Sequence, residues 1–138
     1  MTIFVLDNSV TMRWFFDDGN HPYADAMLFD LMSPTGEAVV PVLWRYEVSA
    51  VLARACSKGA IPAKDAMDFI DDLQALPILV DDESEKHIFR DVHRLAIIYK
   101  LTSYDAAYLE LALRRNLPLA TLDDELKIAA VNAGVIVL

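Results

Sequence analysis

The sequence predicts an α/β fold, with an α/β/α sandwich built around a central, mostly parallel sheet. Short apolar runs typical of buried strands alternate along the chain with longer segments of helical periodicity. That alternation is typical of right-handed crossovers between parallel strands, with helices on both faces of the sheet. The chain has 138 residues, of which 55% are hydrophobic, so we expect a single domain with one core over residues 1–138.

Five apolar runs are the predicted strands, at residues 3–6, 37–40, 77–80, 117–121 and 135–138. The first, Ile3 to Leu6, is apolar at every residue, which is typical of a strand buried on both faces. Pro41 ends the second. Apolar spacing and flanking polar residues predict helices at 9–16, 21–32, 43–58, 63–75, 81–99, 103–115 and 123–132. The helix over 81–99 is expected to bury a stripe of Ile88, Val92, Leu95 and Ala96.

Polar residues and one glycine mark the ends of several of these helices. Asn8 or Ser9 is expected to cap the first helix, Thr102 the helix over 103–115, and Asp123 the last. Gly59 follows the helix over 43–58 as a C-cap.

The charge balance narrows the classes of function. The formal net charge is −9, from 12 Lys and Arg against 21 Asp and Glu. This argues against non-specific nucleic-acid binding through a basic face. It leaves room for a nucleic-acid enzyme whose acids hold metal ions, and it favours a basic partner.

The sequence also indicates a cellular compartment. The single cysteine, Cys56, cannot form an internal disulfide, so we expect a reducing cytoplasm. We expect no membrane association, because no apolar run reaches the roughly 18 residues that a spanning helix needs. A secretory signal peptide is not expected either, since Asp7 interrupts the apolar start.

Acidic residues follow two of the predicted strands. Asp7 ends the first strand, and Asp123 and Asp124 follow the strand over 117–121. In an open parallel sheet, ligands bind beyond the carboxyl ends of the strands. Neighbouring central strands would bring Asp7 within reach of Asp123. The alternative for Asp123 or Asp124 is a simple helix cap.

Glu47 is an acid on an unexpected helix face. It lies nearly opposite the polar side of its helix, and its neighbours one turn away are apolar. A carboxylate on an apolar face is costly to bury unless it is paired or metal-bound. The alternatives are a half-exposed position at the rim of the core, or a pairing with Arg54.

Asp105 repeats this pattern in the helix over 103–115. The solvated face of that helix is expected to carry Glu110 and Arg114, whereas Asp105 is flanked by Tyr108, Leu109 and Ala112. Its position in the first turn has an alternative explanation, because an anion there stabilises the helix N-terminus.

If these acids converge, their mutual repulsion requires a cation. Oxygen-only ligands favour a hard ion, Mg²⁺ or Mn²⁺. The three histidines, His21, His87 and His93, are not spaced as a metal-binding pair, and we expect them on the surface or in packing. The sequence contains no Gly-rich phosphate loop and no G-x-S-x-G nucleophile elbow.

Four motifs make the chain resemble the PIN-domain ribonucleases, and specifically the VapC-type toxins of toxin–antitoxin pairs. The motifs are Val5 to Ser9, Trp44 to Val48, Thr102 to Ala112 and Leu119 to Asp123, and their order and spacing extend over nearly the whole chain. The resemblance implies a PIN-like nuclease domain. The catalytic and metal-binding acids it implies are Asp7, Glu47, Asp105 and Asp123, hereafter the acidic quartet, with Mg²⁺ or Mn²⁺ as cofactor. Asp124 could replace or supplement Asp123 as the fourth acid. Ser9 and Thr121 match the positions of small hydroxyl residues near the metal.

The resemblance also implies an activity and partners. The activity is that of a metal-dependent endoribonuclease, in which water attacks the RNA phosphodiester and the 3′ oxygen leaves. The partners are a second copy in a homodimer and a cognate antitoxin that covers the acidic pocket. Trp14, Phe15 and Phe16 are candidates for an apolar partner groove, and their alternative is ordinary core. We expect an RNA that is structured or selected by shape.

Two other functions fit parts of the sequence. Asp7-Asn8-Ser9-Val10-Thr11 partly mimics the Asp-x-Asp-x-Thr start of a haloacid-dehalogenase-like phosphatase, with Asp123 and Asp124 as the later acidic pair. Ser9 stands where that chemistry needs a second Asp, and the chain is short for that fold. The other alternative is a non-catalytic interaction module with a vestigial acidic pocket, against which the intact acids argue.

Overall fold

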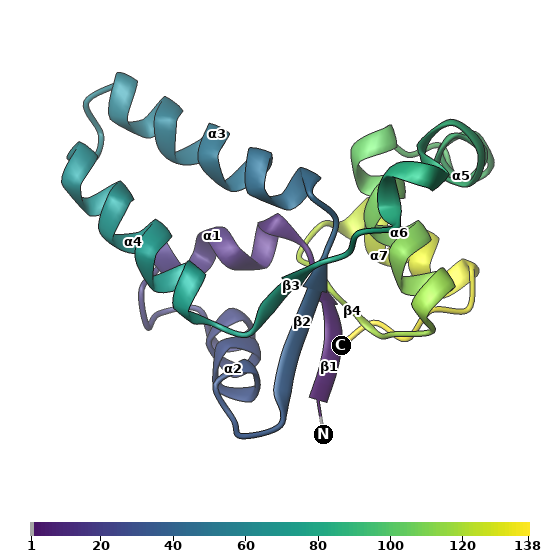
Figure 1. The fold of residues 1–138 in the computed structure, drawn as a ribbon, viewed down its shortest axis with the longest axis horizontal. Coiled ribbons are helices and arrows are strands. Elements are labelled where there is room, and N and C mark those ends of the chain that lie inside the picture. The colour runs from purple at the N-terminus through teal and green to yellow at the C-terminus, as the bar shows by residue number, and fades with distance from the viewer. Residues whose placement is uncertain (1) are drawn as a thin grey trace.

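The computed structural model describes residues 2–138, in which four parallel strands form one sheet of order β3-β2-β1-β4 (Figure 1). The strands are β1 (Thr2–Leu6), β2 (Gly36–Val40), β3 (Ile78–Val80) and β4 (Leu119–Ala120). One side of the sheet is covered by α1 (Asn8–Phe16), α2 (Pro22–Leu31), α3 (Leu43–Ser57) and α4 (Ala63–Ala75). The other side carries α5 (His93–Tyr99), α6 (Ser103–Arg115) and α7 (Asp124–Asn132). The predicted α/β/α sandwich with a parallel sheet is confirmed. No helix within residues 2–138 has the length and apolar character needed to cross a bilayer.

The register of β1 positions the edge of the sheet where the acids lie. Leu6, the last residue of β1, pairs with Ala120, the last residue of β4. The backbone therefore leaves β1 at Asp7 and β4 at Thr121, and these two exits lie side by side. Phe4, Val5 and Leu6 of β1 are fully buried, as expected for a central strand with helices on both faces.

The C-terminal segment differs from the prediction. Residues 135–138 form no strand, and only an isolated bridge joins Val137 to Leu119. The backbone N–H of Leu119 donates to the carbonyl of Ile136, and that of Leu138 donates to the carbonyl of Leu119. The predicted strand over 117–121 is only two residues long, and Thr121, which follows it, donates its hydroxyl to Asp7.

The predicted helix over 81–99 is divided into three segments of different pitch. A 3₁₀ turn, η1 (Ser84–His87), and a π-helical turn, η2 (Ile88–Val92), precede α5. A π turn takes more residues than an α turn, so it rotates the following side chains relative to a regular helix. The predicted buried stripe is therefore wrong at its start, because Val92 is buried whereas Ile88 is exposed.

Two of the three predicted caps are confirmed. Thr102 Oγ1 accepts from the backbone N–H of Asp105 at 3.1 Å, and Asp123 Oδ1 accepts from that of Leu126 at 2.9 Å. The predicted cap of α1 is wrong, because Asp7 is its N-cap residue and makes no side-chain capping bond. Ser9 instead donates its hydroxyl to Asp7.

Glu110 and Arg114 do not form a solvated face on α6. Glu110 is buried because η1 and η2 pack against α6. Arg114 Nε donates to Glu110 Oε1 at 2.6 Å and Arg114 Nη2 donates to Asp81 Oδ2 at 2.7 Å, while Ser84 donates to the same Asp81 oxygen. Burial opposes the ionisation of Asp81, but hydrogen bonds from Arg114 and Ser84 hold its pKa below the usual value. We call these four residues the Arg114 network.

Replacing the cation of the Arg114 network is expected to destabilise the protein. Arg114→Met would remove the nearest cation from two buried carboxylates, leaving Asp81 with the more distant Arg115 at 3.7 Å, and losing such a partner costs about 3 kcal/mol in comparable pairs. Urea unfolding at neutral pH measures the loss. Arg90→Met is the control, because Arg90 is exposed and makes no ion pair within residues 2–138, and it should change the unfolding free energy by less than about 0.5 kcal/mol. Equal effects of the two substitutions would contradict this account.

Candidate active site

Asp7 is the most buried acid at the carboxyl edge of the sheet, with 5% of its surface exposed. Ser9 and Thr121 both donate hydroxyls to its Oδ2 atom, at 2.6 and 2.7 Å, and neither engages Oδ1. Burial raises the pKa of Asp7; these hydrogen bonds oppose the shift, and the charge of Asp123 adds to it. Asp7 is thus a rigidly held carboxylate whose charged form is costly in the metal-free protein.

The same two hydroxyls organise the loop that follows β4. Ser9 Oγ accepts from the backbone N–H of Leu122 at 2.9 Å, and Thr121 Oγ1 accepts from that of Asp123 at 3.0 Å. The loop is tied to Asp7 through these contacts, which brings the charge of Asp123 close to it. Asp124 is exposed and is not among the charges that raise the pKa of Asp7. Of the two acids left open by the sequence, the geometry therefore favours Asp123.

Asp105 comes to this edge from α6. It is half-buried in the first turn, and its pKa is raised from 3.8 to about 6, by burial first and then by the charges of Asp123, Asp7 and Glu125. Glu125, in the first turn of α7, was not singled out by the sequence. Its place two residues after Asp123 was the available signal, but an acid in a first turn has a sufficient explanation in the helix dipole.

Glu47 comes from α3 and is also half-buried. Its Oε1 atom accepts a 2.6 Å hydrogen bond from the hydroxyl of Tyr108. Burial raises the pKa of Glu47, and the charges of Asp7 and Asp105 add to the shift. Within residues 2–138, Glu47 forms no ion pair with Arg54, so that alternative is wrong. In the sequence, Tyr108 counts among the apolar neighbours of Asp105, so its hydrogen bond to Glu47 was not predicted.

The structure therefore brings all four members of the acidic quartet into one electrostatic cluster. None of them forms an ion pair with Lys, Arg or His among the described residues. Oxygen donors carrying uncompensated negative charge fit a hard divalent cation. No three of the quartet have ligand oxygens within 4.8 Å of one another in residues 2–138, so an ion would reach some of them through water.

A second cluster meets a metal-ligand spacing but is explained otherwise. His87, Asp91 and Glu110 present ligand atoms within 4.8 Å of one another. His87 Nδ1 lies 2.7 Å from Asp91 Oδ2, while Glu110 Oε1 already accepts from Arg114. Because the guanidinium balances the buried carboxylate, we interpret this group as an extension of the Arg114 network. The expected packing role of His87 agrees with this contact.

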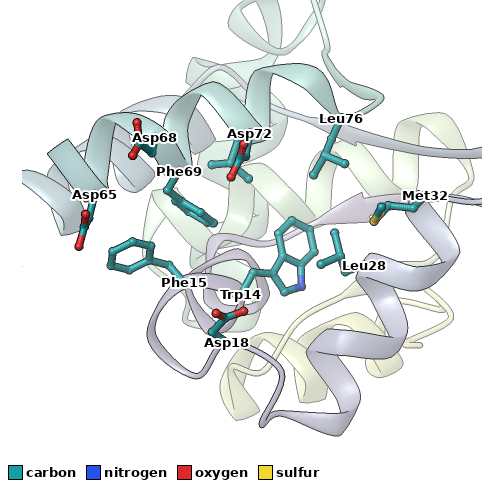
Figure 2. Close-up of a pocket in the computed structure, with 11 residues that line it drawn as sticks. Trp14, Phe15, Asp18, Leu28, Met32, Asp65, Asp68, Phe69, Asp72 and Leu76 are labelled. Carbon is teal, nitrogen blue, oxygen red and sulfur yellow. The ribbon is translucent and has the colours of Figure 1, made fainter.

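An apolar groove of about 490 Å³ lies between α1, α2 and α4 (Figure 2). Its apolar lining comprises Trp14, Phe15, Leu28, Met32, Phe69, Leu73 and Leu76, and its acids are Asp18, Asp65, Asp68 and Asp72. Trp14 is also core, since it is buried and donates its indole N–H to the carbonyl of Ala24 at 2.8 Å. The Phe15 and Phe69 rings lie 5.0 Å apart between centroids. Phe16 is exposed and does not line the groove.

Comparison with known proteins agrees with this architecture. The family model of the PIN domain matches residues 4–132. The fold is similar to that of PAE2754 from Pyrobaculum aerophilum, at a TM-score of 0.66 and 22% identity, covering 93% of this chain and 86% of the other. The structure of VapBC2 from Rickettsia felis bound to a DNA fragment from their promoter is similar at a TM-score of 0.69 and 10% identity, covering 99% of this chain and 98% of the other. That of FitAcB from Neisseria gonorrhoeae is similar at a TM-score of 0.65 and 19% identity, covering 99% of this chain and 96% of the other. No curated protein matches the chain in sequence.

The charge cluster predicts a pH-dependent effect of Asp105→Asn. Because the pKa of Asp105 is about 6 when folded and near 3.8 otherwise, its protonated form stabilises the protein at low pH, and this stability is lost between about pH 4 and 6. Asn does not titrate. The melting temperature of the metal-free variant, relative to the unchanged protein, should therefore rise by a few degrees across this window.

A matched control for this measurement is Asp25→Asn. Asp25 lies in the first turn of α2, as Asp105 does in α6, but it is outside the quartet. Because Asp25 lies outside the quartet, Asp25→Asn should not reproduce the rise in melting temperature expected for Asp105→Asn. Absence of that rise for Asp105→Asn would show that Asp105 does not carry the repulsion assigned to it.

Proposed function

Because the chain belongs to the PIN-domain family, we propose that it is a metal-dependent endoribonuclease that hydrolyses RNA phosphodiester bonds, and the toxin of a toxin–antitoxin pair. PIN domains are typically nucleases. The observation that carries the proposal is the acidic quartet, in which four carboxylates from separate elements share one edge of the sheet without a counter-cation. Acids with perturbed pKa values cluster at functional sites.

The proposed roles follow from how each acid is held. Asp7 has its Oδ2 atom engaged by Ser9 and Thr121, so Oδ1 would be the ligand atom for Mg²⁺ or Mn²⁺. Asp105 would be the second direct ligand. Asp123 has its Oδ1 atom engaged in capping α7, which leaves Oδ2, and with Glu47 it would complete the site directly or through water.

The reaction proposed is the in-line attack of water on the phosphorus, with departure of the 3′ oxygen. When a divalent cation is bound, the chemistry it supplies is a water of lowered pKa and a shield for the charge that develops on the phosphate. The chain's own residues would hold and orient the carboxylates that bind this cation. The hydroxyls of Ser9 and Thr121 fix Asp7, so the carboxylate needs little reorganisation during the reaction.

The groove is the proposed docking site for the antitoxin. Its apolar lining fits the apolar face of an amphipathic segment, and its four aspartates and the net charge of −9 favour basic side chains on that segment. Helix α1 begins beside Asp7 and ends at Phe16, so the groove and the quartet lie at opposite ends of a helix of about 13 Å. A segment seated in the groove and extended along α1 would also cover the acids.

A homodimer and action in the cytoplasm remain part of the proposal. Phe89 of η2 is 93% exposed, and Ile97 and Ile98 of α5 are also exposed, so these elements offer apolar surface to a second copy. Sedimentation at micromolar concentration tests the dimer, and a strictly monomeric chain would exclude it.

Removing a single carboxylate should abolish RNA cleavage without unfolding the protein. Asp7→Asn keeps an oxygen for Ser9 and Thr121 but removes the ligand charge, so the rate should fall by more than about 100-fold, beyond the loss typical of outer-shell partners. The rate is measured as cleavage of total cellular RNA at about 5 mM Mg²⁺ or Mn²⁺. Growth arrest on expression, compared with Asp105→Asn, gives the cellular counterpart.

The controls separate the proposal from its rivals. Asp25→Asn should cleave RNA as the unchanged protein does. Turnover of a generic phosphomonoester without RNA cleavage would favour the phosphatase. Absence of Mn²⁺ binding by calorimetry at millimolar metal would favour a vestigial pocket, and either result would overturn the nuclease proposal.

The docking proposal predicts that a charge in the groove wall weakens the antitoxin complex. Phe69→Glu places an anion against Phe15 and should weaken binding of the purified cognate antitoxin by at least about tenfold. Met67→Glu is the matched control, since Met67 is exposed on the same helix and does not line the groove. Raising the salt concentration should also weaken the complex. Equal affinity of the two variants would exclude the groove as the docking site.

A further inference from the structure

Tyr108 is a buried polar group whose position the nuclease proposal does not by itself explain. It lies on α6, three residues after Asp105, and its side chain is fully buried. Its hydroxyl donates to Glu47 Oε1 on α3 at 2.6 Å, across 61 residues of sequence. Residues three apart share one face of a helix, so α6 presents both a quartet acid and a donor to a second acid on the same side.

Glu47 has few other restraints. Within residues 2–138, the Glu47 side chain makes one hydrogen bond, the one from Tyr108, and it forms no ion pair. A glutamate has several rotatable bonds, and ordering it costs conformational entropy. Repulsion from Asp7 and Asp105 would also drive an unrestrained carboxylate outwards. Asp7, in contrast, is held by two hydroxyls.

The phenol is suited to this task. A tyrosine donates a single O–H, so bonding Oε1 leaves Oε2 of Glu47 without a hydrogen bond from the described residues. The bond adds no positive charge that would compete with a cation, which a lysine or arginine would do. The fully buried ring has little room to move, so the donor is fixed in place.

We propose that Tyr108 is a positioning residue that holds the Glu47 carboxylate at the edge of the acidic quartet, with Oε2 presented for the divalent cation. This inference rests on the proposed function, because it assigns Glu47 to the metal site. Outer-shell partners of metal ligands typically contribute 10- to 100-fold, roughly, to metal affinity or activity. Tyr108 is expected to contribute within that range.

The test is calorimetric titration of Mn²⁺ into the full chain, with and without Tyr108→Phe. The variant loses one oxygen atom and should bind Mn²⁺ at least about tenfold more weakly. Its RNA cleavage should fall at low Mn²⁺ and recover largely at saturating Mn²⁺, with the KM for RNA unchanged. Tyr104→Phe is the matched control, because Tyr104 lies on the same helix with an exposed side chain, and its Mn²⁺ affinity should not change.

A second background separates positioning from a general structural role. If Tyr108 acts through Glu47, adding Tyr108→Phe to Glu47→Ala should change Mn²⁺ affinity by less than about twofold, because the group it holds is gone. A purely structural role would weaken binding equally in both backgrounds, and that result would overturn the proposal.

A third measurement uses the unchanged protein, so it does not depend on whether a Tyr108 variant folds. In the unchanged protein, Mg²⁺ should shift the ¹³Cζ NMR signal of Tyr108 and leave that of Tyr104 in place. Mn²⁺ binding and RNA cleavage by the unchanged protein, combined with no effect at Tyr108 in these tests, would remove the positioning role alone. Absence of both binding and cleavage in the unchanged protein would remove the proposed function and this inference together.

Discussion

The pairing of Leu6 with Ala120 at the ends of β1 and β4 is the constraint on which the site depends. This register delivers Asp7 and Thr121 to the same edge of the sheet, where the hydroxyl of Thr121 bonds the carboxylate of Asp7. A shift of β4 by one residue would turn Thr121 to the opposite face and remove that donor. The loop holding Asp123 would move with it, because the backbone N–H of Asp123 bonds the same hydroxyl.

The protein buries carboxylates in two different ways, and this difference supports the proposed site. In the Arg114 network, a guanidinium lies against Asp81 and Glu110, and the pKa of Asp81 is held low although burial opposes this. In the acidic quartet, burial raises the pKa of Asp7 and of Asp105, and the side chains that bond Asp7 are neutral hydroxyls. A charge balanced within the protein serves the fold. A charge left unbalanced favours a cation, and the nuclease proposal rests on that imbalance.

Periodicity and end signals predicted most of the fold because they reflect local physics. Buried strands and amphipathic helices leave patterns over a few residues, and the parallel sandwich followed from their alternation. The errors arose where a distant partner decided the outcome. Thr121 lies beyond the end of β4 and bonds Asp7, and the C-terminal segment makes a single bridge to Leu119. Glu110 is buried because η1 and η2 pack on it, and the i, i+4 spacing to Arg114 carried no sign of this.

By itself, the sequence determined the α/β/α architecture, the family resemblance and four acids as candidates for one site. Only the tertiary structure decided that Asp123 is the acid tied to Asp7, that Tyr108 bonds Glu47, and that Trp14 and Phe15 share a groove wall with aspartates. The physical reason is range. Strand and helix preferences are set by neighbours within a few residues, whereas a hydrogen bond or a repulsion between carboxylates depends on which distant segments the packing brings together.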